Sequence, residues 1–534
     1  VGATDRLGIL TTDANGRTEL GANINLNGAT STFNDAVLLT ATSTIDQSGA
    51  GNVAFASTID SESGNNFGLS INMTTGSAIF NGNVGTDALG VLSDDSGLGS
   101  LSTNNLTTLN ASTYTATGAQ SFGGAVELGT DVTLNATGVT FTSTVDSDGT
   151  PRDLSINDDG ATTFGGNVGV GSALDSLTTD AAGNTTINAA NINGATLSFG
   201  DSLLLDTDVT LTGTTSVSLA AIDSASGETN SLNVTSPLTS FNGAIGATDA
   251  LSDLVTDAAG NTTISTATLN ANGNQLFNDD VLLNANASFS AGNVTFGSIE
   301  GVGADRDLTV NATSTLSIGT VGSGGNIDDI DFDAATLTLN GNVTAQNTIA
   351  IDTSNALTVG VDVTSGNTTN ITVTADDTGT PTFTLNGGST INSSNGQFTL
   401  QADDVNIAGT INATGQTAFF RSNTNGDIII VGGNSTTNDS LELDDGELDN
   451  VTASTIQIGH ANAGNVTITA AIDAANTATL DLVTGGAVSQ SATVTETNLN
   501  IQAVGAVTMT QSNAVDNLTA TTATGDISFT NNIN

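Results

Sequence analysis

The segment LTTDAAGNTTI at residues 177–187 returns almost unchanged as LVTDAAGNTTI at residues 254–264. Looser copies begin at Leu10 (LTTDANGRTEL) and Leu92 (LSDDSGLGSL), so the four copies start about 80 residues apart. Self-similarity at a fixed period indicates an array of stacked units, because independent globular domains would not share one internal order of landmarks. We therefore interpret the N-terminal part of the chain as a repeat protein.

Phenylalanine marks equivalent positions in these units. One Phe in each unit precedes two apolar positions, and a second Phe closes the unit, except in the fourth copy, where Ile318 takes its place. We expect these rings to form a structural core stack, because period-two apolar residues follow them. The predicted core rings are Phe33, Phe122, Phe199, Phe277, Phe80, Phe164 and Phe241.

Within a unit, apolar residues alternate with Ser and Thr, as in ATLSF at 195–199 and VTLT at 209–212. This alternation, interrupted by Asn, Gly and Asp, is typical of strands joined by turns, and no segment predicts a helix. The core landmarks recur roughly every 20 residues, for example from Phe33 to Phe55. The predicted fold is all-β, a right-handed parallel β-solenoid (β-helix) rod with about 20 residues per coil. Some 25 coils, stacked ~4.8 Å apart, would span roughly 120 Å.

The composition excludes several classes of protein. The 534 residues include 54 acidic residues and only five basic ones, all Arg, for a net charge of −49, and they include no Cys and no Trp. Disulfides, Cys-ligated zinc and iron–sulfur clusters are therefore excluded, and nucleic-acid binding is not expected. No apolar run approaches the length of a membrane helix, so no membrane span is expected in this segment. The absence of Cys and the strong negative charge fit an extracellular setting.

The repeat text resembles a known group of proteins. The segments NVGVGSALDSLTTDAAGNTTI (167–187), DVTLNATGVTFTSTVD (131–146) and GATTFGGNVG (160–169) are similar to units of bacterial β-strand-repeat surface proteins, which are related to filamentous-haemagglutinin-type adhesins. The segments 400–415, 441–473 and 480–490 resemble the haemagglutinin-like coils that follow such units. The resemblance covers nearly the whole chain. It implies a secreted, cell-surface β-solenoid and transfers no catalytic residue.

The repeat pattern of the sequence changes along the chain. Residues 1–325 are predicted to be a β-solenoid of about four units of about 80 residues, and residues 326–534 a continuing β-solenoid with less regular, haemagglutinin-like coils. No Pro-rich or Ser-rich linker separates them, so we expect one continuous stack across residues 320–335. Residues 1–10 match the tail of a unit, GATDALSDL at 246–254. We therefore expect a piece of a longer protein, or a subunit whose ends are covered by neighbours.

Two clusters of acids are candidate calcium sites. Hard metal cations bind several carboxylate oxygens at once. Clustered acids without a basic side chain nearby therefore favour the binding of such an ion. The glycine-rich calcium nonapeptide and the EF-hand loop are both absent, and a solvated acidic face is the alternative. No cofactor is predicted to be required, with calcium as the one candidate ion. The first cluster is Asp328, Asp329, Asp331 and Asp333, and the second is Glu442 and Asp444 with Asp445 and Glu447.

Other polar positions favour structural explanations. His460 lies in a predicted turn and cannot form a metal site alone. Outward threonines such as Thr210 and Thr212 are a pattern found in ice binding, but they are also ordinary in strands. About twenty N-x-S/T sequons leave glycosylation open. Acids that recur at one repeat position are expected to cap turns; they are Asp60, Asp146, Asp223 and Glu300.

These observations favour a non-enzymatic structural protein of the bacterial cell surface. We expect a β-solenoid shaft or filament subunit for adhesion, cell–cell contact or the formation of a matrix or sheath. Its expected partners are further copies, joined end to end or laterally, or a component of the cell surface or matrix. The alternative is a glycan-binding or glycan-processing β-solenoid, because paired carboxylates can cleave sugars. The shortage of large aromatic and basic residues argues against that alternative.

Overall fold

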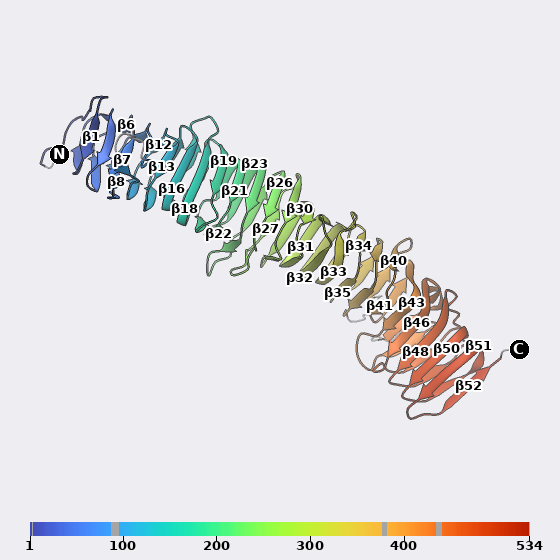
Figure 1. The fold of residues 1–534 in the computed structure, drawn as a ribbon. Coiled ribbons are helices and arrows are strands. Elements are labelled where there is room, and N and C mark those ends of the chain that lie inside the picture. Colours follow the sequence, from blue (N-terminus) through green and yellow to red (C-terminus); the bar gives the residue numbers. More distant parts are fainter. Residues whose placement is uncertain (3, 87–94, 376–381, 434–439, 533–534) are drawn as a thin grey trace. The chain divides into compact units, whose positions relative to one another are not determined.

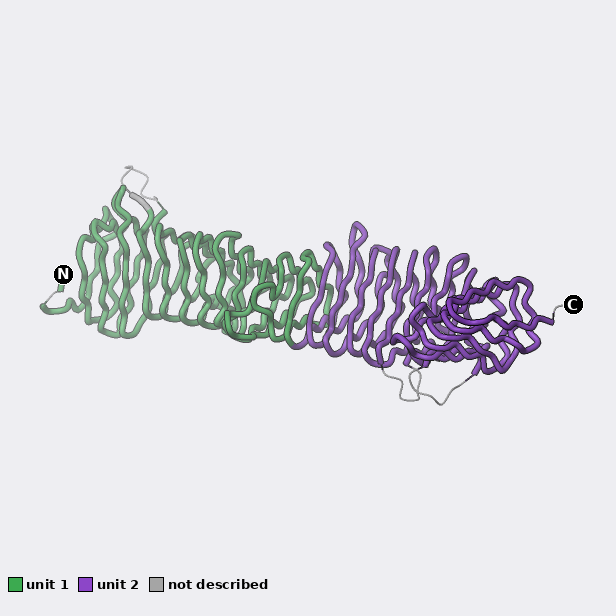
Figure 2. The backbone as a smooth tube through the Cα atoms, turned by 90° about the horizontal axis from the view of Figure 1, so that it is seen from below, with its two compact units in different colours: residues 1–272 green, residues 273–534 purple. Residues whose placement is uncertain are grey.

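The computed structural model describes residues 1–2, 4–86, 95–375, 382–433 and 440–532. Nearly all of the regular structure consists of parallel strands stacked coil upon coil (Figure 1), forming a β-solenoid of about 23 turns with about 21 residues per turn. The predicted all-β solenoid with about 20 residues per coil is therefore confirmed, while its right-handed winding stays a prediction. The chain divides into two compact units, Val1–Asn272 and Gly273–Asn534 (Figure 2).

The first unit contains twenty-nine of the described strands. They are β1 (Arg17–Leu20), β2 (Ile24–Leu26), β3 (Ser31–Phe33), β4 (Ala36–Leu39), β5 (Ser43–Gln47), β6 (Val53–Phe55), β7 (Ile59–Glu62), β8 (Gly68–Met73), β9 (Ala78–Phe80), β10 (Asp95–Ser96), β11 (Ser100–Thr103), β12 (Thr107–Leu109), β13 (Thr113–Thr115), β14 (Ala119–Phe122), β15 (Val126–Leu128), β16 (Val132–Phe141), β17 (Val145–Ser147), β18 (Asp153–Phe164), β19 (Leu174–Thr179), β20 (Asn184–Ile187), β21 (Asn191–Phe199), β22 (Ser202–Leu205), β23 (Val209–Leu219), β24 (Ile222–Ser224), β25 (Leu232–Thr235), β26 (Leu238–Phe241), β27 (Leu254–Thr256), β28 (Asn261–Ile264) and β29 (Thr268–Asn270).

The second unit continues with longer strands and the one described helix. Its elements are β30 (Asn274–Leu283), β31 (Ala287–Gly301), β32 (Arg306–Val321), β33 (Ile327–Leu339), β34 (Val343–Ala345), β35 (Ile349–Thr353), β36 (Leu357–Val359), β37 (Val363–Ser365), β38 (Thr369–Val373), β39 (Phe383–Leu385), β40 (Thr390–Ser393), β41 (Phe398–Gln401), β42 (Val405–Ile407), β43 (Thr410–Arg421), β44 (Ile428–Val431), β45 (Ser440–Leu443), α1 (Asp445–Asp449), β46 (Val451–His460), β47 (Val466–Ile468), β48 (Thr477–Thr484), β49 (Val488–Gln490), β50 (Thr495–Ala503), β51 (Val507–Thr522) and β52 (Ile527–Asn531).

Strands of successive coils pair in parallel and in register. In the first unit, β3, β6, β9, β12, β15 and β17 form one six-stranded sheet. Each position of one coil therefore lies directly over the equivalent position of the next, as Phe33, Phe55 and Phe80 do. The pairing of β10 with β7 is antiparallel, an exception among the described pairs. This register explains why apolar residues recur at equivalent positions of successive coils, because a shift of one residue would turn the apolar face of a strand outward.

The interior is a stack of apolar side chains. In many of the short strands, buried and partly exposed residues alternate, as in β6 and β12, whereas β4 and β45 are buried throughout. The seven predicted core rings are all buried, with at most 2% of their surface exposed. The equivalent rings of different units do not touch one another, because they lie several coils apart. Instead, each of Phe33 and Phe122 begins a short column with rings of the next two coils, Phe55 and Phe80 or Phe141 and Phe164.

The glycine of the repeated TDAxG segment is required by the backbone. Gly16, Gly183 and Gly260 hold the same place in three copies and have φ angles of 93°, 76° and 85°. Residues with a Cβ rarely adopt this left-handed conformation. A Cβ on Gly183 would also lie 1.8 Å from the carbonyl oxygen of Gly160 in the preceding coil. The glycine thus allows the corner to turn and the coils to approach closely.

The second unit has the same construction. β32 pairs in parallel with β31 before it and with β33 after it. Residue 325, where the repeat pattern is predicted to change, lies in the turn between β32 and β33. These two strands are paired with each other, with Leu308 opposite Ile330 and Leu316 opposite Leu337. The division at residues 325 and 326 itself stays a prediction.

The expectation that no helix would form is wrong at one place. Residues Asp445–Asp449 form the short helix α1, with Asp444 as its N-cap. The Asp444 carboxylate accepts the Glu447 backbone N–H, and the Glu447 carboxylate accepts that of Asp444, each at 2.8 Å. This capping box is readable in the sequence as an acid followed three residues later by Glu. The alternation of the surrounding strands concealed it.

Candidate functional site

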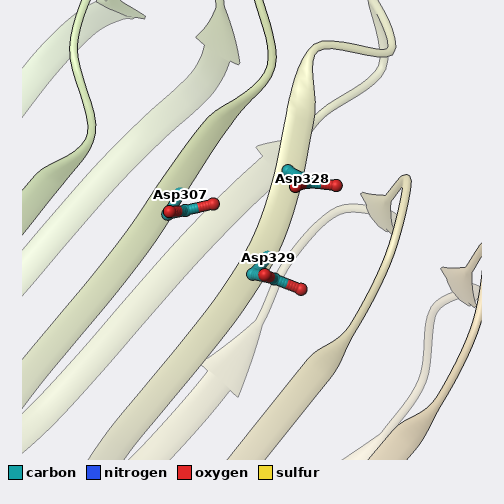
Figure 3. Close-up of side chains that lie close together, drawn as sticks. All are labelled: Asp307, Asp328 and Asp329. Atoms are coloured by element: carbon teal, nitrogen blue, oxygen red, sulfur yellow. The ribbon is translucent and has the colours of Figure 1, made fainter.

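Three carboxylates on neighbouring coils of the second unit lie close together. Asp307 of β32 and Asp328 and Asp329 of β33 are half-buried, and each offers an oxygen atom within 4.8 Å of the others (Figure 3). Two of these residues were predicted as calcium ligands, but Asp307 was missed. Its position about one coil before Asp328 is the signal that could have found it, because equivalent positions in neighbouring coils stack.

The surroundings of this cluster hold its carboxylates in place. Asn286 donates to Asp307 at 2.7 Å, and Asp329 accepts the side-chain amide of Asn347 and the backbone N–H of Thr348, each at 2.9 Å. Burial raises the pKa of Asp328, and the nearby charges of Asp329, Asp307 and Asp305 raise it further. Calcium and magnesium bind to oxygen ligands, and carboxylates that are not paired with a basic side chain are suited to them. These three residues could therefore hold a hard cation.

The other two acids of the first predicted cluster point elsewhere. Asp331 and Asp333 lie on the exposed face of β33, and Asp333 is directly opposite Asp352 of β35. Burial raises the pKa of Asp331, and repulsion by Asp352 and Asp333 adds to the effect. Like charges directly opposite each other weaken a strand pair. These acids form a separate acidic patch on the outer surface.

The second predicted calcium cluster has structural partners. Glu442 is 8% exposed and accepts the Ser440 hydroxyl at 3.0 Å. Asp444 is the N-cap of α1, and Glu447 also accepts the Ile407 backbone N–H at 3.1 Å. Burial raises the pKa of Glu447 to about 7. Helix capping explains why acids gather here, and Glu442 and Asp444 are not part of the three-carboxylate cluster.

The recurring acids cap turns, as predicted. Asp146 accepts the backbone N–H groups of Gly171 and Ser172 at 2.8 and 3.1 Å, and Asp223 accepts that of Thr248 at 2.9 Å. Asp60 and Glu300 make equivalent bonds with the turn of the following coil. Each carboxylate therefore joins the end of one strand to the next turn, which confirms the structural explanation.

His460 does not activate its serine neighbour. The ring Nε2 lies 3.3 Å from the Ser422 hydroxyl, and Nδ1 accepts the Asn462 backbone N–H at 3.3 Å. Because Nδ1 accepts, the neutral ring carries its proton on Nε2 and donates to Ser422. A catalytic base would have to accept a proton from the hydroxyl instead. Burial lowers the pKa of His460, and the positive charge of Arg421 lowers it further.

Three shallow hollows lie on the second unit, with volumes of about 420, 340 and 550 Å³. The hollow of 340 Å³ contains Asp473, Glu496 and Asp516, and burial raises the pKa of Glu496 to about 7. None of the residues lining these three hollows is aromatic or basic. They therefore lack the stacking platforms that sugar rings favour.

The stacked parallel coils define the class of protein, a β-solenoid repeat protein. No described helix is long and apolar enough to cross a membrane. In comparisons with known proteins, no family model, curated protein or solved structure matches the chain.

Proposed function

We propose that this chain is a structural, non-enzymatic protein of the bacterial cell surface, acting as a shaft or filament subunit in adhesion, cell–cell contact or matrix formation. The observation that carries the proposal is the repeated construction of each unit. Among the described residues, successive coils are bonded by parallel ladders around a filled apolar interior, and the short antiparallel pair of β10 with β7 is the exception. A chain built from stacked coils in this way is suited to bridging distance.

The outer surface of the first unit supports this role. One outward position carries a hydroxyl side chain in eight successive coils and no charged residue. Such a regular, neutral row offers neither the charge nor the concavity of a typical small-molecule site. The row consists of Thr113, Thr133, Ser155, Thr178, Ser198, Ser218, Ser240 and Thr263.

The charge balance supports an extracellular location and ion-dependent association. Against a net charge of −49, three of the five arginines are paired with acids. The shortest of these pairs is Arg6 with Asp46 at 2.6 Å. Excess negative charge keeps copies apart at low ionic strength, and screening reduces this repulsion. Divalent ions at the cluster of Asp307, Asp328 and Asp329 would reduce it further.

Microscopy and fractionation of the native source test the proposal. We expect an antibody against the chain to label intact cells or extracellular material, and negative-stain images of that material to contain elongated structures. The purified chain is expected to release no reducing sugar from surface polysaccharides. Labelling confined to the cell interior, or hydrolysis of a glycan that is lost on substitution of surface acids, would refute the structural role.

A further inference from the structure

A column of carboxyl groups runs along one corner of the first unit. Asp158 lies in the middle of β18, Asp180 follows β19, and Asp201 lies two residues after the end of β21, so the three residues occupy consecutive coils. The backbone N–H of Asp158 donates to the Asp180 carboxylate at 3.3 Å. Asp158 and Asp201 are each only 2% exposed, whereas Asp180 is partly exposed. Two of the three groups are therefore removed from water.

Asp201 is bridged to the preceding coil by two threonines. Its carboxylate oxygens accept the hydroxyl groups of Thr179 at 2.6 Å and Thr185 at 2.8 Å. Both threonines are buried and belong to the repeated TDAAGNT segment, which explains why that segment begins and ends with Thr. The carboxylate closes the corner between β19 and β20.

The same bridge occurs in the first copy of the repeat. Asp35 accepts the hydroxyl groups of Thr12 at 2.5 Å and Thr18 at 2.9 Å. The second copy has Gly124 at the position of the acid, and there the hydroxyl groups of Thr103 and Thr107 lie 2.7 Å apart and bond directly. The chain thus contains a natural version of the corner without the carboxyl group.

Asp158 differs from both bridged acids. Neither of its oxygens has a well-formed hydrogen bond, although the Thr162 hydroxyl and the Val139 backbone N–H are near enough to lower its pKa somewhat. Burial raises the pKa of Asp158, and the nearby charges of Asp180 and Asp201 raise it further. Burial also raises the pKa of Asp201, against the lowering effect of its two threonines, and Asp180 again adds to the rise. An ionised carboxylate without partners is costly in such surroundings, whereas the neutral acid is tolerated.

We propose that buried Asp158, which lies beside Asp180 and Asp201, is a proton-dependent latch: the corner of β18 to β22 stays closed while Asp158 is protonated and loosens when Asp158 ionises. The folded state holds this proton more tightly than the unfolded chain does. The stabilising contribution is therefore fully present below the unfolded pKa of about 3.9 and is lost as pH rises through the folded pKa. The opening equilibrium should grow about tenfold for each unit by which a pKa is raised.

Hydrogen exchange followed by mass spectrometry tests this latch on the whole chain, with rates corrected for the intrinsic effect of pH. As the pH is raised from below the unfolded Asp pKa of about 3.9, we expect β18 and β21 to open progressively more in the wild-type protein. Asp158→Asn, which mimics the neutral acid, should abolish this dependence. Asp159→Asn is the matched control, because Asp159 is the adjacent residue and is exposed; it should behave like the wild type.

Two further observations keep the test decisive. Asp180→Asn removes the repulsion without touching the buried core, so it should reduce the pH dependence even if Asp158→Asn folds poorly. The corner of β11, β12 and β14, where Gly124 replaces the acid, should show no comparable dependence in the same sample. An equal dependence at both corners, or an unchanged one in Asp158→Asn and Asp180→Asn, would overturn the proposal in favour of general charge repulsion.

Discussion

Removal of the central ring of a phenylalanine column should be the most damaging single truncation in the first unit. Phe141 has no exposed surface, and its ring stacks on those of Phe122 and Phe164 with centroid distances of 5.3 and 5.5 Å and interplanar angles of 13° and 5°. Truncation of a buried Phe to Ala costs ~3–5 kcal/mol in transfer and cavity terms. Each aromatic pair contributes a further ~0.5–1.5 kcal/mol. We therefore expect Phe141→Ala to cost about 5 kcal/mol or more locally.

Native-state hydrogen exchange measures this loss coil by coil, which suits a repeat protein whose coils need not unfold together. Phe199→Ala removes a ring that is also buried, with 2% of its surface exposed, but belongs to neither column, and about 3–4 kcal/mol is expected there. Phe67→Ala is the control for a partly exposed ring and should cost less than about 1 kcal/mol. If Phe141→Ala were no more destabilising than Phe67→Ala, the filled aromatic interior would not be a main source of stability.

Three further predictions concern the acids. Calcium added at low ionic strength should cause association that light scattering detects, and Asp328→Asn with Asp329→Asn should weaken it; association unchanged in this double variant would exclude the cluster as the bridging site. Asp146→Ala removes a turn cap and should lower local stability by about 1 kcal/mol, measured by exchange of the turn at Gly171, whereas an unchanged turn would show that the cap is dispensable. Because burial raises the pKa of Glu496 to about 7 from 4.5, its stabilising contribution is complete below about pH 4.5 and is lost as pH rises through about 7. Glu496→Gln should remove this decline in urea titrations, and a decline of the same size in the variant would assign it to other groups.

The coil length and the identity of the core rings were predictable from local pattern. Period-two alternation assigns each side chain to the inner or outer face, and a repeated landmark such as Phe33 to Phe55 measures one coil. The turn-capping acids were predictable for the same reason, since Asp146 and Asp223 follow strand ends at equivalent positions. The helix α1 was not predicted although its capping box is local, because strands with a period-two pattern lie on either side of this five-residue segment.

The alternation and the repeat are enough to predict stacked strands with rings such as that of Phe141 inside, because they leave no other face for these rings. Which polar groups meet depends on the packing of the coils in three dimensions. Asp307 joins Asp328 and Asp329, and Asp201 joins Thr179 and Thr185, across separations of 16 to 22 residues that correspond to about one coil. The turn lengths vary from coil to coil, so the vertical alignment of any two polar side chains depends on the accumulated register of the ladder. That register arises from hydrogen bonds between coils, which no local sequence pattern contains.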